Sequence, residues 1–319
     1  MPRLSHLPRR TGDAEVTILL GLYNGARFLG EQLASYAAQE GVRWRLLAAD
    51  DGSTDATRAI LARFAAEDRA RRVALIDGPG RGAAPNFLRL LAVADPDTEL
   101  AALSDQDDVW LPGKLARAAA ALHGLPRDLP ALYCGRTVIC DARLHRLGTS
   151  PDFRRAPSFR NALVQNLAGG NTMVLNRAAL RLARAAAAEA GEVVMHDWWL
   201  YQLVTGAGGL VLYDREPMVL YRQHGTNLIG ANASLAARVR RARLVAGGLL
   251  RRWNETNIAA LTASAHRLTP ENRAILAAFA EAKQAPFRAR IGTRARLGLY
   301  RQTRAGRASY WVAAAAGLI

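Results

Sequence analysis

Several kinds of residue are scarce in this 319-residue chain, and each shortage excludes a class of protein. Two cysteines, Cys134 and Cys140, are too few for the disulfide framework of a small secreted domain, and we expect both to be reduced core residues. No apolar run is long enough to span a bilayer, and no apolar stretch follows the arginines near the N-terminus. The sequence therefore predicts a cytoplasmic protein without a secretory signal, either soluble or attached to a membrane surface.

Lysine is almost absent, since 41 of the 43 basic residues are arginines. The formal net charge of +16 is also uneven, because residues 1–232 carry a net charge of +3 and residues 233–319 carry +13. Such asymmetry indicates an anionic partner for the C-terminal segment, and arginines beside apolar and aromatic residues favour an interfacial helix on an anionic membrane surface. Nucleic acid would suit the charge equally, but no nucleic-acid module is recognisable. A solvated arginine-rich surface is the third alternative.

Half of the residues are hydrophobic and 22% are charged, which is typical of a globular protein. Strand-like runs at 15–20, 44–49, 73–76 and 99–103 alternate with helical spacing at 26–39, 55–68 and 85–94. This alternation predicts an α/β fold with a mainly parallel, Rossmann-like sheet and helices on both faces. After residue 122 the pattern is mixed, and from residue 233 a composition rich in Ala, Leu and Arg predicts a C-terminal helical appendage.

The segment 104–110, directly after the apolar run 100–103, is the strongest indication of chemistry. It places Asp105, Asp107 and Asp108 within four positions, and carboxylates this close repel one another unless a cation lies between them. Mg²⁺ and Mn²⁺ take such oxygen ligands and leave positions for water and phosphate, which predicts an enzyme acting on a phosphorylated ligand. Asp-rich segments also form turns and helix caps, and Asp108 can equally cap the helix that begins near Pro112.

Two other polar pairs follow predicted strands. They are Tyr23-Asn24 and Asp50-Asp51. Because ligands of parallel α/β sheets bind beyond the carboxyl ends of the strands, we expect both pairs to converge with the Asp105–Asp107 segment on one edge.

Six motifs occur in order along the chain. They are Val16 to Asn24, Asp50 to Asp55, Ser104 to Trp110, Gly169-Gly170-Asn171, His196-Asp197-Trp198-Trp199 and Tyr221 to Asn227. In order and spacing they resemble the family 2 glycosyltransferases, and within that family the bacterial rhamnosyltransferase-like branch. The resemblance implies an inverting enzyme with the A-type glycosyltransferase fold.

The resemblance also implies a domain organisation. Residues 1–14 would be an N-terminal extension, residues 15–232 the catalytic domain, and residues 233–319 the basic helical C-terminal region. Within the catalytic domain, residues 15–125 would form the nucleotide-sugar-binding half and residues 126–232 the acceptor half.

For the donor, the resemblance implies Asp107 as metal ligand, with Asp105 contacting the metal or the ribose and His224 completing the site. One of Asp50 and Asp51 would bind the base and the other organise the turn. The donor-binding residues implied are Leu22, Tyr23, Asn24, Asp50, Asp51, Arg81, Asp105 and Gln106. Core packing is the alternative for Tyr23, and an ordinary surface position is the alternative for Arg81.

For the acceptor, Asp197 matches the acidic position that serves as catalytic base in this family. We expect an apolar setting that raises its pKa, although an Asp at a helix start is commonly just an N-cap. His196 departs from the acidic residue found in many members, so its role stays open. Gly170 and Asn171 would contact the acceptor, and Trp198 and Trp199 would stack on a sugar or anchor their helix.

The resemblance implies a Mg²⁺- or Mn²⁺-dependent inverting transfer of a sugar from a dTDP- or UDP-sugar. Rhamnose is one candidate sugar. The acceptor would be a hydroxyl of a glycan or lipid-linked glycan, reached at the inner face of the cytoplasmic membrane. One alternative is a nucleotidyltransferase, whose usual Gly-rich signature after the first strand is absent. Another is a non-catalytic membrane or nucleic-acid adaptor, which would leave the Asp cluster without a role.

Overall fold

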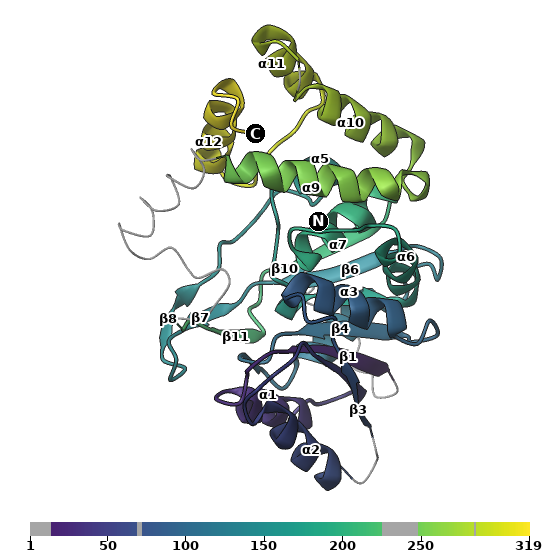
Figure 1. Ribbon diagram of the computed structural model, residues 1–319, viewed down its shortest axis with the longest axis vertical. Helices are drawn as coiled ribbons and strands as arrows, with labels where there is room; N and C mark the ends of the chain where they lie inside the picture. Colours follow the sequence, from purple (N-terminus) through teal and green to yellow (C-terminus); the bar gives the residue numbers. More distant parts are fainter. Residues whose placement is uncertain (1–13, 69–71, 225–247, 284) are drawn as a thin grey trace.

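The computed structural model describes residues 14–68, 72–224, 248–283 and 285–319 (Figure 1). The strands are β1 Glu15–Leu22, β2 Arg43–Asp50, β3 Val73–Asp77, β4 Leu100–Ser104, β5 Val109–Trp110, β6 Ala131–Gly135, β7 Val138–Cys140, β8 Arg146–Thr149, β9 Val174–Asn176, β10 Leu210–Asp214 and β11 Val219–Arg222. The helices are α1 Leu29–Ala37, α2 Thr57–Glu67, α3 Ala83–Val93, α4 Lys114–Leu122, α5 Phe159–Ala162, α6 Arg177–Ala187, α7 His196–Gly206, α9 Leu249–Ala263, α10 Pro270–Glu281, α11 Phe287–Arg296 and α12 Arg304–Ala315.

The strands form a seven-stranded sheet in the order β10-β6-β9-β4-β1-β2-β3. Strand β1 pairs in parallel with β2 and β4, and β2 pairs in parallel with β3. Only β9, between β4 and β6, runs antiparallel to its neighbours in this sheet. The predicted α/β fold with a mainly parallel sheet is confirmed.

Helices cover both faces of this sheet. Val16, Ile18 and Leu20 of β1 contribute to the apolar cluster that includes buried residues of α1, α2 and α4, whereas Leu19 belongs to the cluster under α3, α6 and α7. Strands that are buried on both faces are apolar at nearly every position, and this explains why the sequence of β1 is an almost continuous apolar run. The polar ends of the strands are therefore where functional groups can gather.

A second sheet, in the order β5-β11-β7-β8, lies beside the segment that follows β4. Val219 of β11 pairs with Trp110 of β5 in antiparallel register. The Asp-rich segment between β4 and β5 is thereby tied to the strand that ends at Arg222.

Helices α9 to α12 gather at one end of the molecule, beyond α7 and far from α1 and α2 (Figure 1). A third apolar cluster joins them to Phe159 and Leu163. The predicted helical C-terminal region is present, although its expected boundary at 232/233 and residues 1–13 of the N-terminal extension lie outside the described residues. None of the described helices is both long and apolar enough to cross a membrane.

The apolar residues of α11 and α12 mainly face this third cluster rather than solvent. The members that we expected to contact lipid and that pack there are Ile291, Leu297, Leu299, Tyr310 and Trp311. The expectation of an apolar lipid-facing helix is therefore wrong for these two helices, since their apolar face already stabilises the fold. The large apolar side chains that stay exposed there are Phe287 and Val312, at 55% and 70%. The arginine cluster at 238–243 lies outside the described residues.

Candidate active site

The predicted polar edge lies at the carboxyl ends of β1, β2 and β4. Leu22 pairs with Asp50, and Leu20 pairs with Ser104, so the three strands end close to one another. Each is followed by polar residues, and this brings the three motifs together as the sequence predicted.

Asp50 organises the turn after β2. Its buried carboxylate accepts hydrogen bonds from the Ser53 hydroxyl and, at 3.2 Å, from the Ser53 backbone N–H. Arg58 Nε donates to the same carboxylate at 2.6 Å. With its oxygens engaged in this way, Asp50 serves the turn.

Asp51 holds the Gly-rich loop 78–82. Its carboxylate accepts the backbone N–H groups of Gly80 at 2.7 Å and Gly82 at 2.6 Å. Both glycines have positive φ, and a Cβ at Gly78 would come within 2.8 Å of Asp51 Oδ1. Glycine allows the backbone to wrap this closely around the carboxylate. Arg81 lies between the two donors with an exposed side chain.

Tyr23 is held through its backbone and leaves its ring in solvent. Gln106 Nε2 donates to the Tyr23 carbonyl at 2.7 Å, and Gln106 Oε1 accepts from the Tyr23 N–H at 2.9 Å. A Cβ at Gly25 would lie 2.2 Å from Gln106 Oε1, so only glycine leaves room for this clamp. The Tyr23 side chain is 58% exposed, which excludes core packing. The Gln106 amide is occupied by this clamp, which corrects its expected contact with the donor.

Leu22 and Asn24, both expected to touch the donor, are structural instead. The Leu22 side chain is buried in the core. Asn24 has a φ of 47° and its Oδ1 accepts the Thr54 N–H at 2.8 Å, while its own N–H donates to Ser53 Oγ at 2.9 Å. These bonds join the loop after β1 to the turn after β2, so Asn24, although exposed, helps to shape the site.

Asp105 carries a carboxylate to which the described residues make no hydrogen bond, although it is only partly exposed. Its pKa is raised well above the usual range, first by burial and then by Asp108, Asp107 and Asp197. A largely buried carboxylate that lies near three others and has no basic group hydrogen-bonded to it forms a site that a cation would stabilise. Asp197 is distant in sequence, so this electrostatic coupling joins the two halves of the domain.

Asp107 pairs with His224, whose Nε2 lies 2.7 Å from Asp107 Oδ2. The His224 ring also packs against Phe28, with ring centroids 4.9 Å apart. In the part of the chain that the structure describes, no group of three His, Cys, Asp or Glu side chains could by itself hold a metal ion. Asp105, Asp107 and His224 are thus neighbours but do not form a preassembled cage.

Asp108 has a different role from its neighbours. It is fully buried, accepts hydrogen bonds from Asn171 Nδ2 and, at 3.1 Å, from the Arg222 backbone N–H, and does not cap α4, which has no side-chain cap. Burial, followed by the charge of Asp107, raises its pKa to about 7. The helix-cap alternative is therefore wrong, because Asp108 instead joins the Asp cluster to the Gly-Gly-Asn segment and β11.

Asp197 lies in the first turn of α7, and its two oxygens accept backbone N–H groups of Gly170 at 3.2 Å and Trp198 at 2.6 Å. The side chain is partly exposed, so the expected apolar setting is not found. His196 beside it is buried and stacked on Phe87, and burial lowers its pKa. A Cβ at Gly170 would meet His196 Nε2 at 2.3 Å, so the glycine lets this ring approach the loop.

Three residues expected to contact the acceptor are buried. Asn171 donates to Asp108, Trp198 Nε1 donates to the Ala162 carbonyl at 2.7 Å, and Trp199 is fully buried in the core. Neither tryptophan offers a face to a sugar, which corrects the stacking alternative. Gly170 contributes its backbone N–H to Asp197.

Arg222 is a residue whose importance the sequence reasoning missed. It is buried, and its guanidinium donates to the carbonyls of Asp107 at 2.9 Å and Ala142 at 2.6 Å and pairs with Glu31 at 2.8 Å. It thereby holds the backbone of the Asp cluster. One signal was available, since Arg222 ends a strand inside the last of the six motifs.

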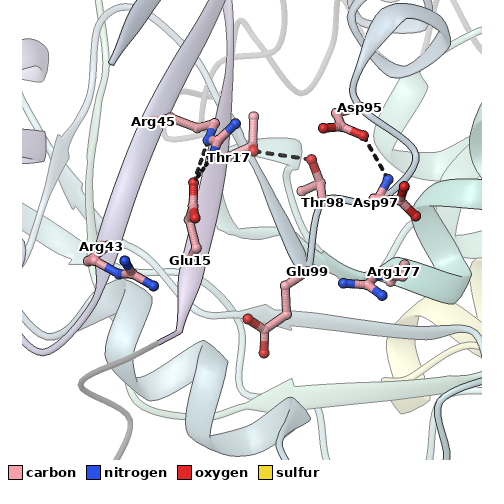
Figure 2. Close-up of a pocket in the computed structure, with 9 residues that line it drawn as sticks. All are labelled: Glu15, Thr17, Arg43, Arg45, Asp95, Asp97, Thr98, Glu99 and Arg177. Carbon is pink, nitrogen blue, oxygen red and sulfur yellow. Dashed lines mark hydrogen bonds and ion pairs between the residues drawn. The ribbon is translucent and has the colours of Figure 1, made fainter. Parts of the chain in front are cut away.

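A hollow of about 210 Å³ lies at the opposite edge of the sheet, at the amino ends of β1, β2 and β4 (Figure 2). Its acids are largely exposed and several are partnered: Glu15 pairs with Arg45, Asp97 pairs with Arg181 at 2.5 Å, and Asp95 accepts the Asp97 N–H at 2.9 Å. Paired surface charges of this kind are typical of a solvated face. The hollow contains none of the predicted site residues.

Comparison with known proteins identifies the family of the chain. Residues 17–182 match the family described as Glycosyl transferase family 2. The chain belongs to this family. As a family 2 glycosyltransferase it is an enzyme that uses a nucleotide sugar, so the nucleotidyltransferase and adaptor alternatives are not supported.

Individual relatives agree with this assignment. This glycosyltransferase is 28% identical over 235 residues to the dTDP-rhamnosyl transferase RfbG of Shigella flexneri, covering 71% of this chain and 78% of that protein. It is 31% identical over 109 residues to the putative glycosyltransferase EpsE of Bacillus subtilis, covering 34% and 38%. Its fold is similar to that of S. aureus TarS 1-349 in complex with UDP-GlcNAc, with a TM-score of 0.52, 13% identity and coverage of 95% and 90%.

Proposed function

We propose that this glycosyltransferase moves a sugar from a dTDP- or UDP-sugar to an acceptor hydroxyl by a single inverting displacement. One observation carries the proposal: the Asp105 carboxylate, with its raised pKa, lies among Asp107, Asp108 and Asp197 at the carboxyl edge of the sheet. The Asp105 carboxylate has no basic group hydrogen-bonded to it. A cation bound by these acidic groups could therefore link them to the diphosphate of a donor. The division into a donor half at 15–125, an acceptor half at 126–232 and a basic C-terminal region is part of the same proposal.

The residues present fit a divalent cation whose coordination is completed by the substrate. Mg²⁺ is commonly held by one or two carboxylates together with substrate phosphates and water. Asp105 and Asp107 would supply the carboxylates, and His224 would orient Asp107 through their 2.7 Å contact. When bound, Mg²⁺ or Mn²⁺ would neutralise charge on the leaving diphosphate.

Asp197 is the proposed base. The two backbone N–H groups fix the direction of its carboxylate, while its remaining lone pairs can accept a proton from an acceptor hydroxyl. Inversion needs only this one base, because the hydroxyl attacks as the nucleoside diphosphate leaves from the opposite face.

Three residues are proposed to receive the nucleoside. The exposed Tyr23 ring can stack on the base. Asp51 accepts the Gly80 and Gly82 N–H groups and keeps further lone pairs, which can accept the imide N–H of uracil or thymine. Arg81 is exposed on the loop that Asp51 holds and can reach the base or a phosphate.

Rhamnose is the proposed donor sugar, because a relative aligned over most of this chain is named a dTDP-rhamnosyl transferase. The proposed acceptor is a glycan or a lipid-linked glycan in the cytoplasm. Arg288, Arg296, Arg304 and Arg307 are exposed on α11 and α12 and can contact an anionic membrane surface through charge. Binding to anionic vesicles that weakens steeply as salt is raised would support this contact.

The test is a thermal-shift and turnover screen of nucleotide sugars with and without Mn²⁺ or Mg²⁺. A donor that binds only the folded protein raises its melting temperature. We expect dTDP-rhamnose with metal to give the largest shift, and Asp197→Asn to lower transfer by about 10²–10⁴-fold while preserving that shift. No shift and no turnover with any nucleotide sugar would contradict the proposal.

A further inference from the structure

A pocket of about 470 Å³ lies between the loop that precedes α7 and the first turns of α9. Val193 and Val194 line it from the loop, and Leu249 and Trp253 line it from the helix. Its volume lies within the range of about 300–1,000 Å³ that is typical of small-molecule sites. None of the residues assigned above to the donor or to catalysis lines it.

The pocket is close to the proposed base. Val194 precedes Asp197 by three residues, so their Cα atoms are at most about 11 Å apart. Trp253 packs edge-on against Trp198, with ring centroids 6.4 Å apart, and Trp198 follows Asp197 directly. A molecule in this pocket would therefore lie near the proposed base.

The walls combine apolar and charged groups. Trp253 and the two valines offer apolar surface, while Glu192 and Glu255 offer carboxylates. The Glu255 carboxylate is held in place by Lys283 Nζ at 2.7 Å and Arg251 Nε at 3.2 Å. The Glu192 side chain is exposed, and no side chain of the described residues pairs with it.

This combination matches a saccharide ring. A sugar has a face of C–H groups, which packs on an aromatic ring, and a rim of hydroxyls, which donate to carboxylates. A lipid acyl chain would instead have no hydroxyl to donate to the Glu192 and Glu255 carboxylates.

We propose that this pocket binds a non-reacting saccharide unit of the acceptor, and thereby positions the neighbouring acceptor hydroxyl at Asp197. The inference rests on the proposed function. Trp253 supplies the stacking face, and Glu192 accepts hydrogen bonds from the sugar hydroxyls.

The test uses the full chain saturated with dTDP and the diamagnetic ion Mg²⁺. It is titrated with the methyl glycosides of rhamnose, mannose, galactose, glucose and N-acetylglucosamine, and binding is followed by saturation-transfer NMR. We expect at least one glycoside to bind. Trp253→Ala should weaken its affinity tenfold or more, Trp253→Phe should restore most of the loss, and Glu192→Gln should weaken it by a smaller factor. Phe287→Ala, which removes an exposed aromatic ring elsewhere in the C-terminal region, should match the wild type.

Two failures are distinguishable. If the wild type binds neither dTDP nor any nucleotide sugar, the proposed function fails. If dTDP binds but no glycoside does, or if glycoside binding is unchanged in both Trp253→Ala and Glu192→Gln, the pocket proposal is overturned. Because Glu192 is exposed, Glu192→Gln tests the pocket even where Trp253→Ala lowers the melting temperature.

Discussion

Strand β4 separates two acidic segments that end in opposite environments. Before the strand, the segment 95–99 has three acids in five residues, and after it the segment 105–108 has three in four. The first three acids are exposed and line the hollow drawn in Figure 2. Asp97 also pairs with Arg181. In the second segment Asp105 is only partly exposed, Asp108 is fully buried, and both have raised pKa values.

Acid density alone therefore does not mark a functional site. At the amino edge the three carboxylates are exposed to solvent and Asp97 pairs with an arginine, and such exposed pairs contribute little to stability. At the carboxyl edge, burial leaves the carboxylates acting on one another, and perturbed pKa values of this kind cluster at functional sites. The difference arises from the direction of the strand, because loops at the carboxyl ends of parallel strands surround the ligand crevice.

The largest expected effect separates the two edges directly. Asp107→Asn should lower kcat by about 10²–10³-fold, since it removes a group proposed to stabilise charge on the leaving diphosphate. Asp97→Asn, the matched change at the amino edge, should leave kcat within twofold. Turnover of the nucleotide sugar measures both. Equal losses in the two variants would mean that the comparison of the edges is wrong.

The second prediction concerns how tightly the carboxyl edge is packed. Gly170→Ala places a Cβ 2.3 Å from His196 Nε2, so the loop must move and carry with it the N–H that orients Asp197. We expect about a tenfold or larger loss of kcat, because displacements near 1 Å have effects of this size or more, together with a lower melting temperature. Gly30→Ala in α1, where nothing lies within 4 Å of the new Cβ, should be neutral or slightly stabilising. A fully active Gly170→Ala enzyme would contradict this.

The third prediction uses the two lysines of the chain. Lys114, buried below the Asp cluster with its Nζ 3.5 Å from the Trp110 ring centroid, has its pKa lowered by burial to about 7. A lowered pKa means that the unfolded chain binds the proton more tightly. The contribution of Lys114 to the stability of the folded state is therefore full above about pH 10.5 and decreases as the pH falls towards 7.

Urea denaturation at pH 7 and pH 9.5 measures this effect. The gain in stability towards pH 9.5 should be smaller in Lys114→Met than in the wild type. Lys283→Met removes a lysine that pairs with Glu255 in the C-terminal region, and it should leave the pH dependence as in the wild type. The same pH dependence in all three proteins would show that Lys114 remains solvated.

The smallest effect is expected at the amino edge. Arg45→Gln breaks an exposed pair with Glu15, and exposed pairs typically contribute about 0–1 kcal/mol. The unfolding free energy from urea titration should change by less than about 1 kcal/mol, with kcat unchanged. A larger change in kcat would mean that the amino edge communicates with the site.

Most of the fold could be predicted from sequence periodicity. The helix expected at 85–94 is α3 at 83–93, and the strand expected at 99–103 is β4 at 100–104. The antiparallel placement of β9 between β4 and β6 could not be predicted, because strand order depends on contacts between distant segments. The apolar residues of α11 and α12 were assigned to lipid, since amphipathic spacing does not tell which surface covers the apolar face.

At the candidate site, the structure brings the predicted segments to one edge of the sheet, but several side chains that we expected to meet a ligand hold loops or the core instead. Gln106, Asn24, Trp198 and Trp199 have the polar or aromatic character expected of ligand contacts, yet each is used to hold the loops or the core. An amide or indole side chain can hydrogen-bond either to a ligand or to the protein backbone. Side-chain rotamers and tertiary packing decide between the two, and the spacing of residues along the sequence does not determine them.

The sequence by itself determined the alternation of strands and helices, and with it the edge at which Tyr23, Asp51 and Asp105 meet, because strand direction follows from the order of the elements. Only the tertiary structure decided which carboxylates stay unpartnered. The Asp50 carboxylate is engaged by its own turn and by an arginine, and the Asp108 carboxylate accepts a hydrogen bond from an asparagine. The Asp105 carboxylate receives no hydrogen bond from the described residues. Burial raises the pKa of the Asp105 carboxylate, and so does the approach of Asp197, a residue 92 positions further along the chain.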